Sequence, residues 1–118
     1  MIEGNCHCGD ISFSVAEDPE SLTECNCSIC RRLGSLWVHA PINSITITKK
    51  GETIAYIQGD RSLAIHSCKK CGCTTHWENL NPSEDAVMAV NFRMCSDEDR
   101  TRFPVRHFDG ADTWSFLD

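Results

Sequence analysis

The sequence lacks any long run of apolar residues. No stretch approaches the roughly 18 consecutive apolar residues that a membrane-spanning helix needs. Its first ten residues, MIEGNCHCGD, contain neither the basic segment nor the apolar segment of a secretory signal. We therefore expect a soluble, cytoplasmic protein with no membrane partner.

Basic residues are also scarce. The chain carries 11 Lys and Arg against 17 Asp and Glu, which gives a formal net charge of -6. The basic residues form nothing larger than pairs such as Arg31-Arg32 and Lys69-Lys70. A field of this sign repels a phosphate backbone, so we expect no nucleic-acid partner.

Internal repeats, low-complexity tracts and linkers are absent too. A chain of 118 residues is long enough to bury one core of modest size and too short for two. We expect a single domain that spans residues 1–118.

Helical periodicity is nearly missing, and alternation of apolar and polar residues takes its place. Seven segments show this period of two between turn signals: residues 10–15, 35–40, 44–50, 52–58, 62–67, 86–92 and 103–108. Helix signals are confined to CSICRRLG and CSDEDRTR, and Ser96 is a suitable N-cap for the second. The pattern predicts an all-β fold of short antiparallel strands.

Cysteine is the residue in excess, with nine in 118 positions. The cysteines form a pair, two triplets and a singleton: Cys6 and Cys8; Cys25, Cys27 and Cys30; Cys68, Cys71 and Cys73; Cys95. A secreted disulfide scaffold would carry an export signal and usually an even number of cysteines. In a reducing compartment, clustered thiols indicate metal, and Zn²⁺ is the ion that such sets usually hold.

The spacing of the cysteines alone allows two ways of assigning them to metal ions. The fragment CKKCG is typical of a zinc knuckle, in which Gly72 is free to take the positive φ of a tight turn. Joining the knuckle to CHCG gives a closed site that ties the first strand to the middle of the chain. A ribbon-like site made from CSIC and the knuckle fits the spacing equally well. If the first grouping holds, Cys73 is the most obvious residue to complete the remaining triplet.

Four motifs occur in a specific order: GNCHCGDISFSV, CNCSICRRLGSL, HSCKKCGCTTHW and VRHFDGADTW. Together they resemble the glutathione-dependent formaldehyde-activating enzyme family, which also includes centromere protein V. The resemblance implies a zinc-bearing all-β fold of the β-tent type. It also implies two zinc ions per chain, one structural and one catalytic.

The resemblance carries over to individual residues. It implies that the structural ion is held by Cys6, Cys8, Cys68 and Cys71. It implies that the catalytic ion is held by Cys25, Cys27 and Cys30, with one coordination position left open for an incoming thiol or water. The implied partner is a small thiol such as glutathione, which adds to formaldehyde to give S-hydroxymethylglutathione. Formally this is a carbon–sulfur lyase reaction run backwards.

Residues that come after the triplet of Cys25, Cys27 and Cys30 have expected roles of their own. Arg31 and Arg32 are placed to pair with substrate carboxylates through bidentate hydrogen bonds. Trp37 is expected to line a substrate cleft. Asp109 with Gly110 fits a turn better than a catalytic acid.

Three classes of function remain open at this point. The open triplet favours an enzyme that acts on a thiol adduct, with carbon–sulfur lyase as the leading activity. The short chain favours a zinc-stapled β module that binds a protein partner. The surplus Cys73 and Cys95 favour a thiol-redox or metal-handling protein.

Overall fold

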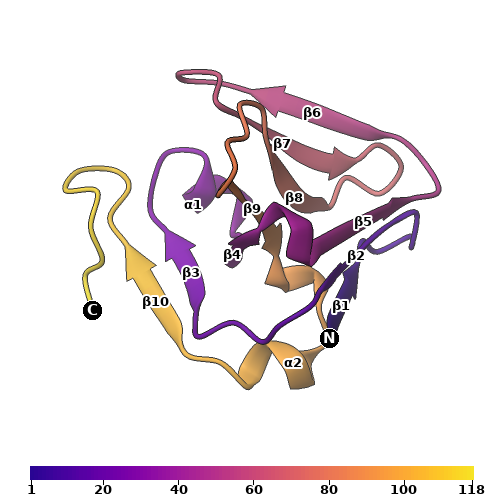
Figure 1. Ribbon diagram of the computed structural model, residues 1–118, viewed down its shortest axis with the longest axis horizontal. Helices are drawn as coiled ribbons and strands as arrows, with labels where there is room; N and C mark the ends of the chain where they lie inside the picture. The colour runs from indigo at the N-terminus through magenta and orange to yellow at the C-terminus, as the bar shows by residue number, and fades with distance from the viewer.

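The computed structural model describes residues 1–118, and strands dominate it (Figure 1). The elements are β1 (Ile2–Asn5), β2 (Ile11–Val15), β3 (Leu22–Cys25), α1 (Cys30–Leu33), β4 (Trp37–Pro41), η1 (Ile42–Ser44), β5 (Ile45–Lys49), β6 (Thr53–Ile57), β7 (Leu63–Cys68), β8 (Thr74–Asn79), β9 (Val87–Asn91), η2 (Phe92–Met94), α2 (Asp97–Thr101) and β10 (Val105–Phe108). The all-β prediction is confirmed.

The strands form two sheets. The smaller has the order β1-β2-β5, and the larger has the order β10-β3-β4-β9-β8-β7-β6. Every neighbouring pair is antiparallel except β10 with β3, which is parallel. In that parallel pair Phe108 lies opposite Cys25. The chain therefore returns at its C-terminal end to the strand that ends with Cys25.

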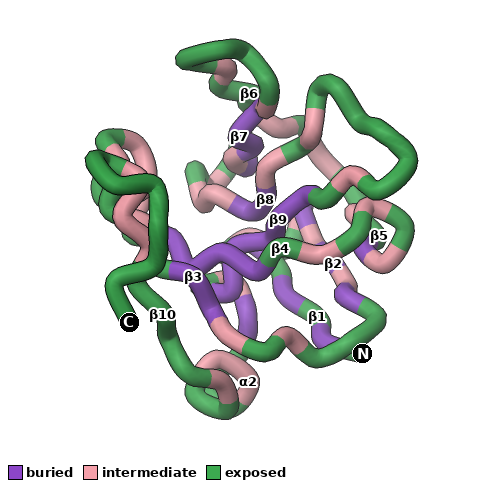
Figure 2. The backbone as a smooth tube through the Cα atoms, turned by 60° about the vertical axis from the view of Figure 1, so that its left-hand side comes forward, coloured by how far each residue is buried: buried purple, intermediate pink, exposed green.

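The main core joins the two sheets. Alternate residues of β2 are buried in the pattern that its sequence predicts, with Phe13 and Val15 inward. They belong to one cluster with residues of both sheets: Ile2, Leu22, Leu36, Val38, Ile45, Met88, Val90, Phe92 and Cys95. Burial is concentrated in the central strands, whereas β10 and the segment after it are exposed (Figure 2). The core thus holds β3 and β4 firmly, and the C-terminal segment lies outside it.

A smaller core lies where the two sheets meet at the cysteines. Cys6, Ile11 and Cys68 are fully buried there, and Cys8, Cys71, Cys73 and Met94 pack around them. This cluster joins the β1–β2 hairpin of one sheet to the β7–β8 hairpin of the other. Only three residues are fully buried at this junction. Apolar burial is therefore too small to hold the two sheets together there, and interactions of the sulfur atoms must contribute much of the stability.

Both α-helices are short, as the scarcity of helical periodicity predicts. Helix α2 begins after Ser96, whose Oγ accepts a hydrogen bond of 3.1 Å from the backbone N–H of Asp99. Helix α1 ends at Gly34, which adopts a left-handed conformation with φ of 66°. Neither helix is long and apolar enough to cross a membrane.

Candidate metal centres and the cavities beside them

Four cysteines from distant parts of the chain converge on one point. The Sγ atoms of Cys6, Cys8, Cys68 and Cys71 all lie within 4.8 Å of one another. Cys8 Sγ is 3.7 Å from Cys6 Sγ and 3.6 Å from Cys68 Sγ, far beyond the length of a disulfide bond. A tetrahedral site with Zn–S bonds of 2.3 Å has edges of about 3.8 Å. This four-cysteine group therefore has the geometry to hold a zinc-like ion.

Two glycine turns shape the four-cysteine group. Gly9 follows Cys8 with φ of 85°, and Gly72 follows Cys71 with φ of 80°; the second confirms the conformation that CKKCG predicts. The turns direct backbone N–H groups at sulfur, as in the 3.3 Å hydrogen bond from Ile11 N to Cys6 Sγ. Backbone hydrogen bonding, chiefly from Cys73, lowers the pKa of Cys71 to about 5. The surroundings thus favour the thiolate form of Cys71, which is the form that binds metal. At Cys8 a backbone hydrogen bond from Asp10 is outweighed by burial and by the neighbouring thiols, which raise its pKa to about 12, so a cation is needed to ionise the whole group.

The alternative ribbon-like grouping does not form. Cys27 and Cys30 belong to a separate group and lie apart from Cys68 and Cys71. Cys73, the most obvious candidate to complete the triplet, packs beside the four-cysteine group instead. The local reason is the tight turn after Cys71, in which Cys68 N donates to Cys73 O at 2.9 Å. This bond keeps Cys73 next to the knuckle.

The second group consists of Cys25, Cys27 and Cys30, whose Sγ atoms also lie within 4.8 Å of one another. Cys25 ends β3, Cys27 lies in the turn that follows, and Cys30 begins α1. Each is half-buried. Four side chains would be needed to close a structural zinc site, and no further His, Cys, Asp or Glu ligand atom belongs to this group.

Hydrogen bonds to sulfur orient the triplet. The backbone N–H of Cys30 donates to Cys27 Sγ at 3.4 Å, and the indole N–H of Trp37 donates to Cys30 Sγ at 3.3 Å. Burial alone would raise the pKa of Cys27, but the hydrogen bonds from Cys30 outweigh it, so the pKa lies below its ordinary value. Burial raises the pKa of Cys30 to about 12. Cys27 is therefore the first thiol of the triplet to ionise, and a cation is needed to ionise all three.

A turn formed by residues 109–115 closes over the triplet. Asn26 holds it by donating to Asp109 Oδ1 at 3.0 Å and by accepting from the backbone N–H of Ala111 at 3.0 Å. Asp109 also accepts from the Thr113 hydroxyl at 2.9 Å, so it stabilises the turn, as its sequence context predicts. Gly110 approaches so closely that a Cβ there would lie 2.6 Å from Cys25 Sγ.

A large apolar cavity opens beside the triplet. It has a volume of about 580 Å³, and all three cysteines contribute to its wall. Five large aromatic side chains also line it: Trp37, Trp77, Phe108, Trp114 and Phe116. The expectation that Trp37 lines a cleft is confirmed. His39 faces the same cavity edge-on to Trp77, with ring centroids 5.8 Å apart, and burial lowers its pKa.

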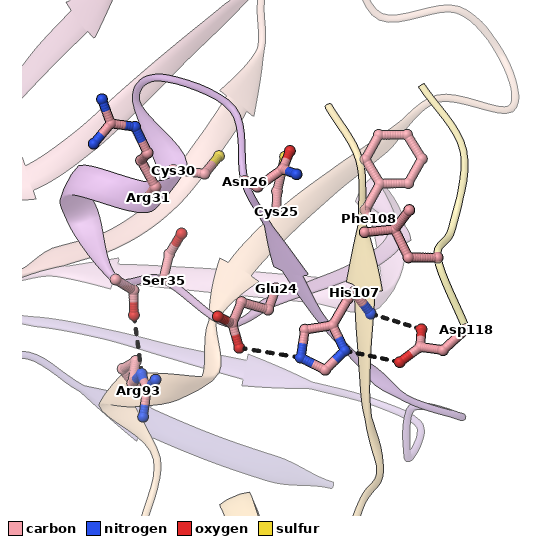
Figure 3. A pocket seen from close by; sticks show the side chains of 12 residues that line it. Glu24, Cys25, Asn26, Cys30, Arg31, Ser35, Arg93, His107, Phe108 and Asp118 are labelled. Carbon is pink, nitrogen blue, oxygen red and sulfur yellow. Dashed lines mark hydrogen bonds and ion pairs between the residues drawn. The ribbon is translucent and has the colours of Figure 1, made fainter. Parts of the chain in front are cut away.

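A second, polar cavity of about 360 Å³ lies against Cys25 and Cys30 (Figure 3). Arg31 and Arg93 line it. His107 pairs with Asp118 at 2.7 Å and with Glu24 at 3.7 Å, and the hydrogen bond to Asp118 raises the pKa of His107. This pairing offsets part of the charge of the two carboxylates, and both carboxylates pair with His107 rather than with Arg31 or Arg93.

Not every predicted residue lies at a cavity. Arg32 lines neither one, because its guanidinium donates to the backbone carbonyl of Ser28 at 2.7 Å. His66 lies on β7, the strand that leads into the knuckle, and bonds to Thr53 at 2.8 Å and to Glu78 at 2.9 Å.

The sequence alone did not point to Ser35, Arg93, Phe108 or Phe116 as cavity residues. Arg93 lies in a segment with no motif, and Ser35 lies within CNCSICRRLGSL but gives no signal of its own. The fold brings the two together from positions far apart in the chain. The aromatic residues could have been found from the sequence, because three of them flank the turn in FDGADTWSF. An aromatic cluster around a loop is typical of a binding site.

The fold and the two cysteine groups define an all-β protein with two potential metal centres, one enclosed and one open to cavities. The model of the family "Glutathione-dependent formaldehyde-activating enzyme" matches residues 1–109. The chain belongs to this family, and the resemblance read from the four motifs is confirmed.

A solved structure has the same fold. It is the crystal structure of a Rhodobacter sphaeroides protein, 24% identical in sequence, with a TM-score of 0.69. The match covers 88% of this chain and 99% of that one. At this level of identity the likeness establishes the shared fold alone.

Proposed function

We propose that this protein is a zinc-dependent carbon–sulfur lyase that interconverts a hemithioacetal with its thiol and its aldehyde. In this proposal a structural zinc ion is held by Cys6, Cys8, Cys68 and Cys71, and a catalytic one by Cys25, Cys27 and Cys30. The observation that carries it is the position of the triplet: three converging thiols, without a fourth protein ligand, in the wall of a cavity. Membership of the family supports the same chemistry.

The ligands in both cysteine groups suit zinc. Soft thiolates select zinc over hard divalent cations, and four of them make the closed tetrahedral set of a structural site. A zinc ion with three protein ligands supplies an open position and lowers the pKa of the thiol that enters it. The N–H groups directed at Cys27 and Cys30 hold these sulfur atoms in place.

Proton transfer is assigned to His39. Cleavage of a hemithioacetal breaks the C–S bond, leaves the electron pair on sulfur, and removes the proton of the hydroxyl group. Apart from the cysteines, His39 is the titratable side chain in the wall of the apolar cavity. Because burial lowers its pKa below the ordinary value, the imidazole is neutral at pH 7 and free to accept a proton.

The redox alternative finds less support. Burial raises the pKa of Cys95 to about 12, and the pKa of Cys73 also lies above its ordinary value. Thiols of this kind react slowly, because the thiolate is the nucleophile. The protein-binding alternative is supported by exposed apolar side chains such as Ile54 and Tyr56 on the edge strand β6, but these lie away from the cysteine triplet and do not explain its open position.

The lyase activity can be tested by NMR exchange spectroscopy on glutathione mixed with formaldehyde. We expect the zinc-loaded protein to speed the interconversion of S-hydroxymethylglutathione with its components, and we expect EDTA-treated protein not to do so. If every thiol adduct tried exchanges only at its uncatalysed rate, the proposal is wrong.

Arg31→Ala should weaken binding of the charged thiol. The Arg31 side chain lines the polar cavity and makes no ion pair within the chain, so it is free to bind a carboxylate of glutathione. We expect KM for glutathione to rise about 10-fold with kcat nearly unchanged, since a partly exposed charged hydrogen bond contributes about 1 to 1.5 kcal/mol. Steady-state kinetics measure both constants.

Arg32→Ala is the matched control for Arg31→Ala, because it removes the same charge from the next residue, which lines neither cavity. It should leave KM within about 2-fold of wild type. Equal effects of the two substitutions would mean that long-range attraction by positive charge, and not a direct contact with Arg31, determines KM. Arg31 would then lose its assigned role.

Gly110→Ala should loosen the catalytic zinc selectively. The new methyl group would lie 2.6 Å from Cys25 Sγ and 3.2 Å from Cys27 Cβ, so the closing turn must move away. We expect the affinity of the second zinc to fall about 10- to 100-fold, as is usual when the support of a ligand is lost. Competition with a chromophoric chelator measures both sites. Asp112→Ala, in the same exposed turn, should leave both affinities unchanged.

A further inference from the structure

The apolar cavity is much larger than formaldehyde requires. A cavity of about 150 Å³ is enough to hold benzene, and this one measures about 580 Å³. Formaldehyde has two heavy atoms and no apolar group. It would leave nearly the whole aromatic wall facing solvent, so the cavity contributes nothing to the recognition of that aldehyde.

The wall of the apolar cavity also lacks carboxylate, ammonium and guanidinium groups. None of its lining residues is Lys, Arg, Asp or Glu, and His39 is neutral at pH 7 because burial lowers its pKa. A carboxylate placed there would lose its hydration without gaining a cationic side chain as a partner, which costs several kcal/mol. The charged ends of glutathione therefore do not belong in this cavity.

The polar cavity provides a place for those charged ends. It shares Cys25, Cys30 and Phe108 with the apolar cavity, and it adds Arg31 and Arg93. Ser35 contributes a hydroxyl that makes no hydrogen bond within the chain, although the residue is only 2% exposed. A substrate sulfur at the triplet thus has a polar space on one side and an aromatic space on the other.

We infer that the aldehyde component of the substrate carries an aromatic ring, which occupies the apolar cavity, while the thiol component occupies the polar one. This rests on the proposed lyase function and names its substrate class: hemithioacetals of aromatic aldehydes. The reaction balances as R–CH(OH)–S–R′ giving R–CHO and R′–SH. The C–S bond breaks, its electron pair goes to sulfur, and the hydroxyl proton passes through His39 to the departing thiolate. No oxidant or reductant is needed.

The tryptophans make binding in this cavity directly measurable. The chain has three tryptophans, and all three line the apolar cavity. S-benzylglutathione and S-methylglutathione are stable probes that share the charged part and differ only in the ring. In titrations followed by tryptophan fluorescence, we expect the benzyl compound to bind at least about 10-fold more tightly than the methyl compound, from the apolar area that the ring buries.

Two variants locate the ring. Leu63→Asp places a carboxylate in the wall of the apolar cavity, at a half-buried position. It should abolish the preference for the benzyl compound while leaving binding of the methyl compound within about 2-fold. Ile54→Asp makes the same change on β6 at a side chain that is 58% exposed, and it should keep the preference. Trp114→Ala serves if Leu63→Asp does not fold, since Trp114 is 72% exposed and tolerates truncation.

Turnover separates this inference from the function on which it rests. Exchange is measured with glutathione adducts of benzaldehyde and of formaldehyde, and kcat/KM should be at least about 10-fold higher for the benzaldehyde adduct. Equal or better turnover of the formaldehyde adduct, or equal binding of the two probes, overturns the inference and leaves the lyase function standing. No turnover of either adduct, in protein that still prefers the benzyl probe, overturns the lyase function and supports the place assigned to the ring.

Discussion

Cys68→Ser is expected to abolish cooperative folding at 37 °C. The Cys68 side chain is fully buried and belongs to the group that joins the two sheets, where apolar burial is small. A structural zinc site contributes on the order of 10 kcal/mol to the folded state, which is comparable to the whole stability of a typical domain, about 5 to 15 kcal/mol. Circular dichroism during thermal unfolding, together with zinc content, measures the effect.

Cys73→Ser is the control for Cys68→Ser. Cys73 packs beside the same four sulfur atoms without being one of them, so the variant tests the chemistry of the ligand rather than the space around it. The loss in its free energy of unfolding should stay below about 2 kcal/mol, which is ordinary for a partly buried position. If the two variants unfold at the same temperature, the four-cysteine group is not a metal site.

Cys27→Ser should remove turnover and leave most of the stability. Cys27 is the triplet thiol with the lowered pKa and is half-buried in the wall of the apolar cavity. We expect kcat/KM to fall by about 100-fold or more, since loss of a group that stabilises charge at a reacting centre has effects of this size. A zinc ion bound by cysteines within residues 25–30 closes only a short loop, so it stabilises the fold little.

The comparison of the two cysteine variants decides the role of the triplet. The melting temperature of Cys27→Ser should stay within a few degrees of wild type while Cys68→Ser loses its transition. If Cys27→Ser instead loses as much melting temperature as Cys68→Ser and the exchange rate is unchanged, the second site is structural. The lyase assignment would then have to be abandoned.

Most of the fold was predictable because seven strands show the alternation that a half-buried sheet requires. Strands β1, β3 and β8 escaped prediction. Strand β8 lies between β7 and β9 and buries Thr75 and His76, which satisfy each other through a 2.8 Å hydrogen bond. Polar residues that are buried in this way leave no apolar pattern in the sequence. That residues 1–118 form a single domain remains a prediction.

The site was predictable in its chemistry and not in its surroundings. Cysteine spacing marks the metal-binding segments, but it allowed two groupings, and only the fold brings CHCG rather than CSIC next to the knuckle. The parallel pairing of β10 with β3 is a contact across most of the chain. It positions Gly110 and the aromatic residues after it over the triplet. Neither the apolar cavity nor its contrast with the polar one follows from any local motif.

Both the fold and the proposed function depend on ionised cysteines that bind zinc. Metal analysis of protein purified without chelator tests this dependence. The account predicts two equivalents of zinc per chain, and loss of the folded circular dichroism spectrum when EDTA removes them. Reduced protein that contains no zinc and keeps an unchanged spectrum after exhaustive EDTA treatment would contradict it.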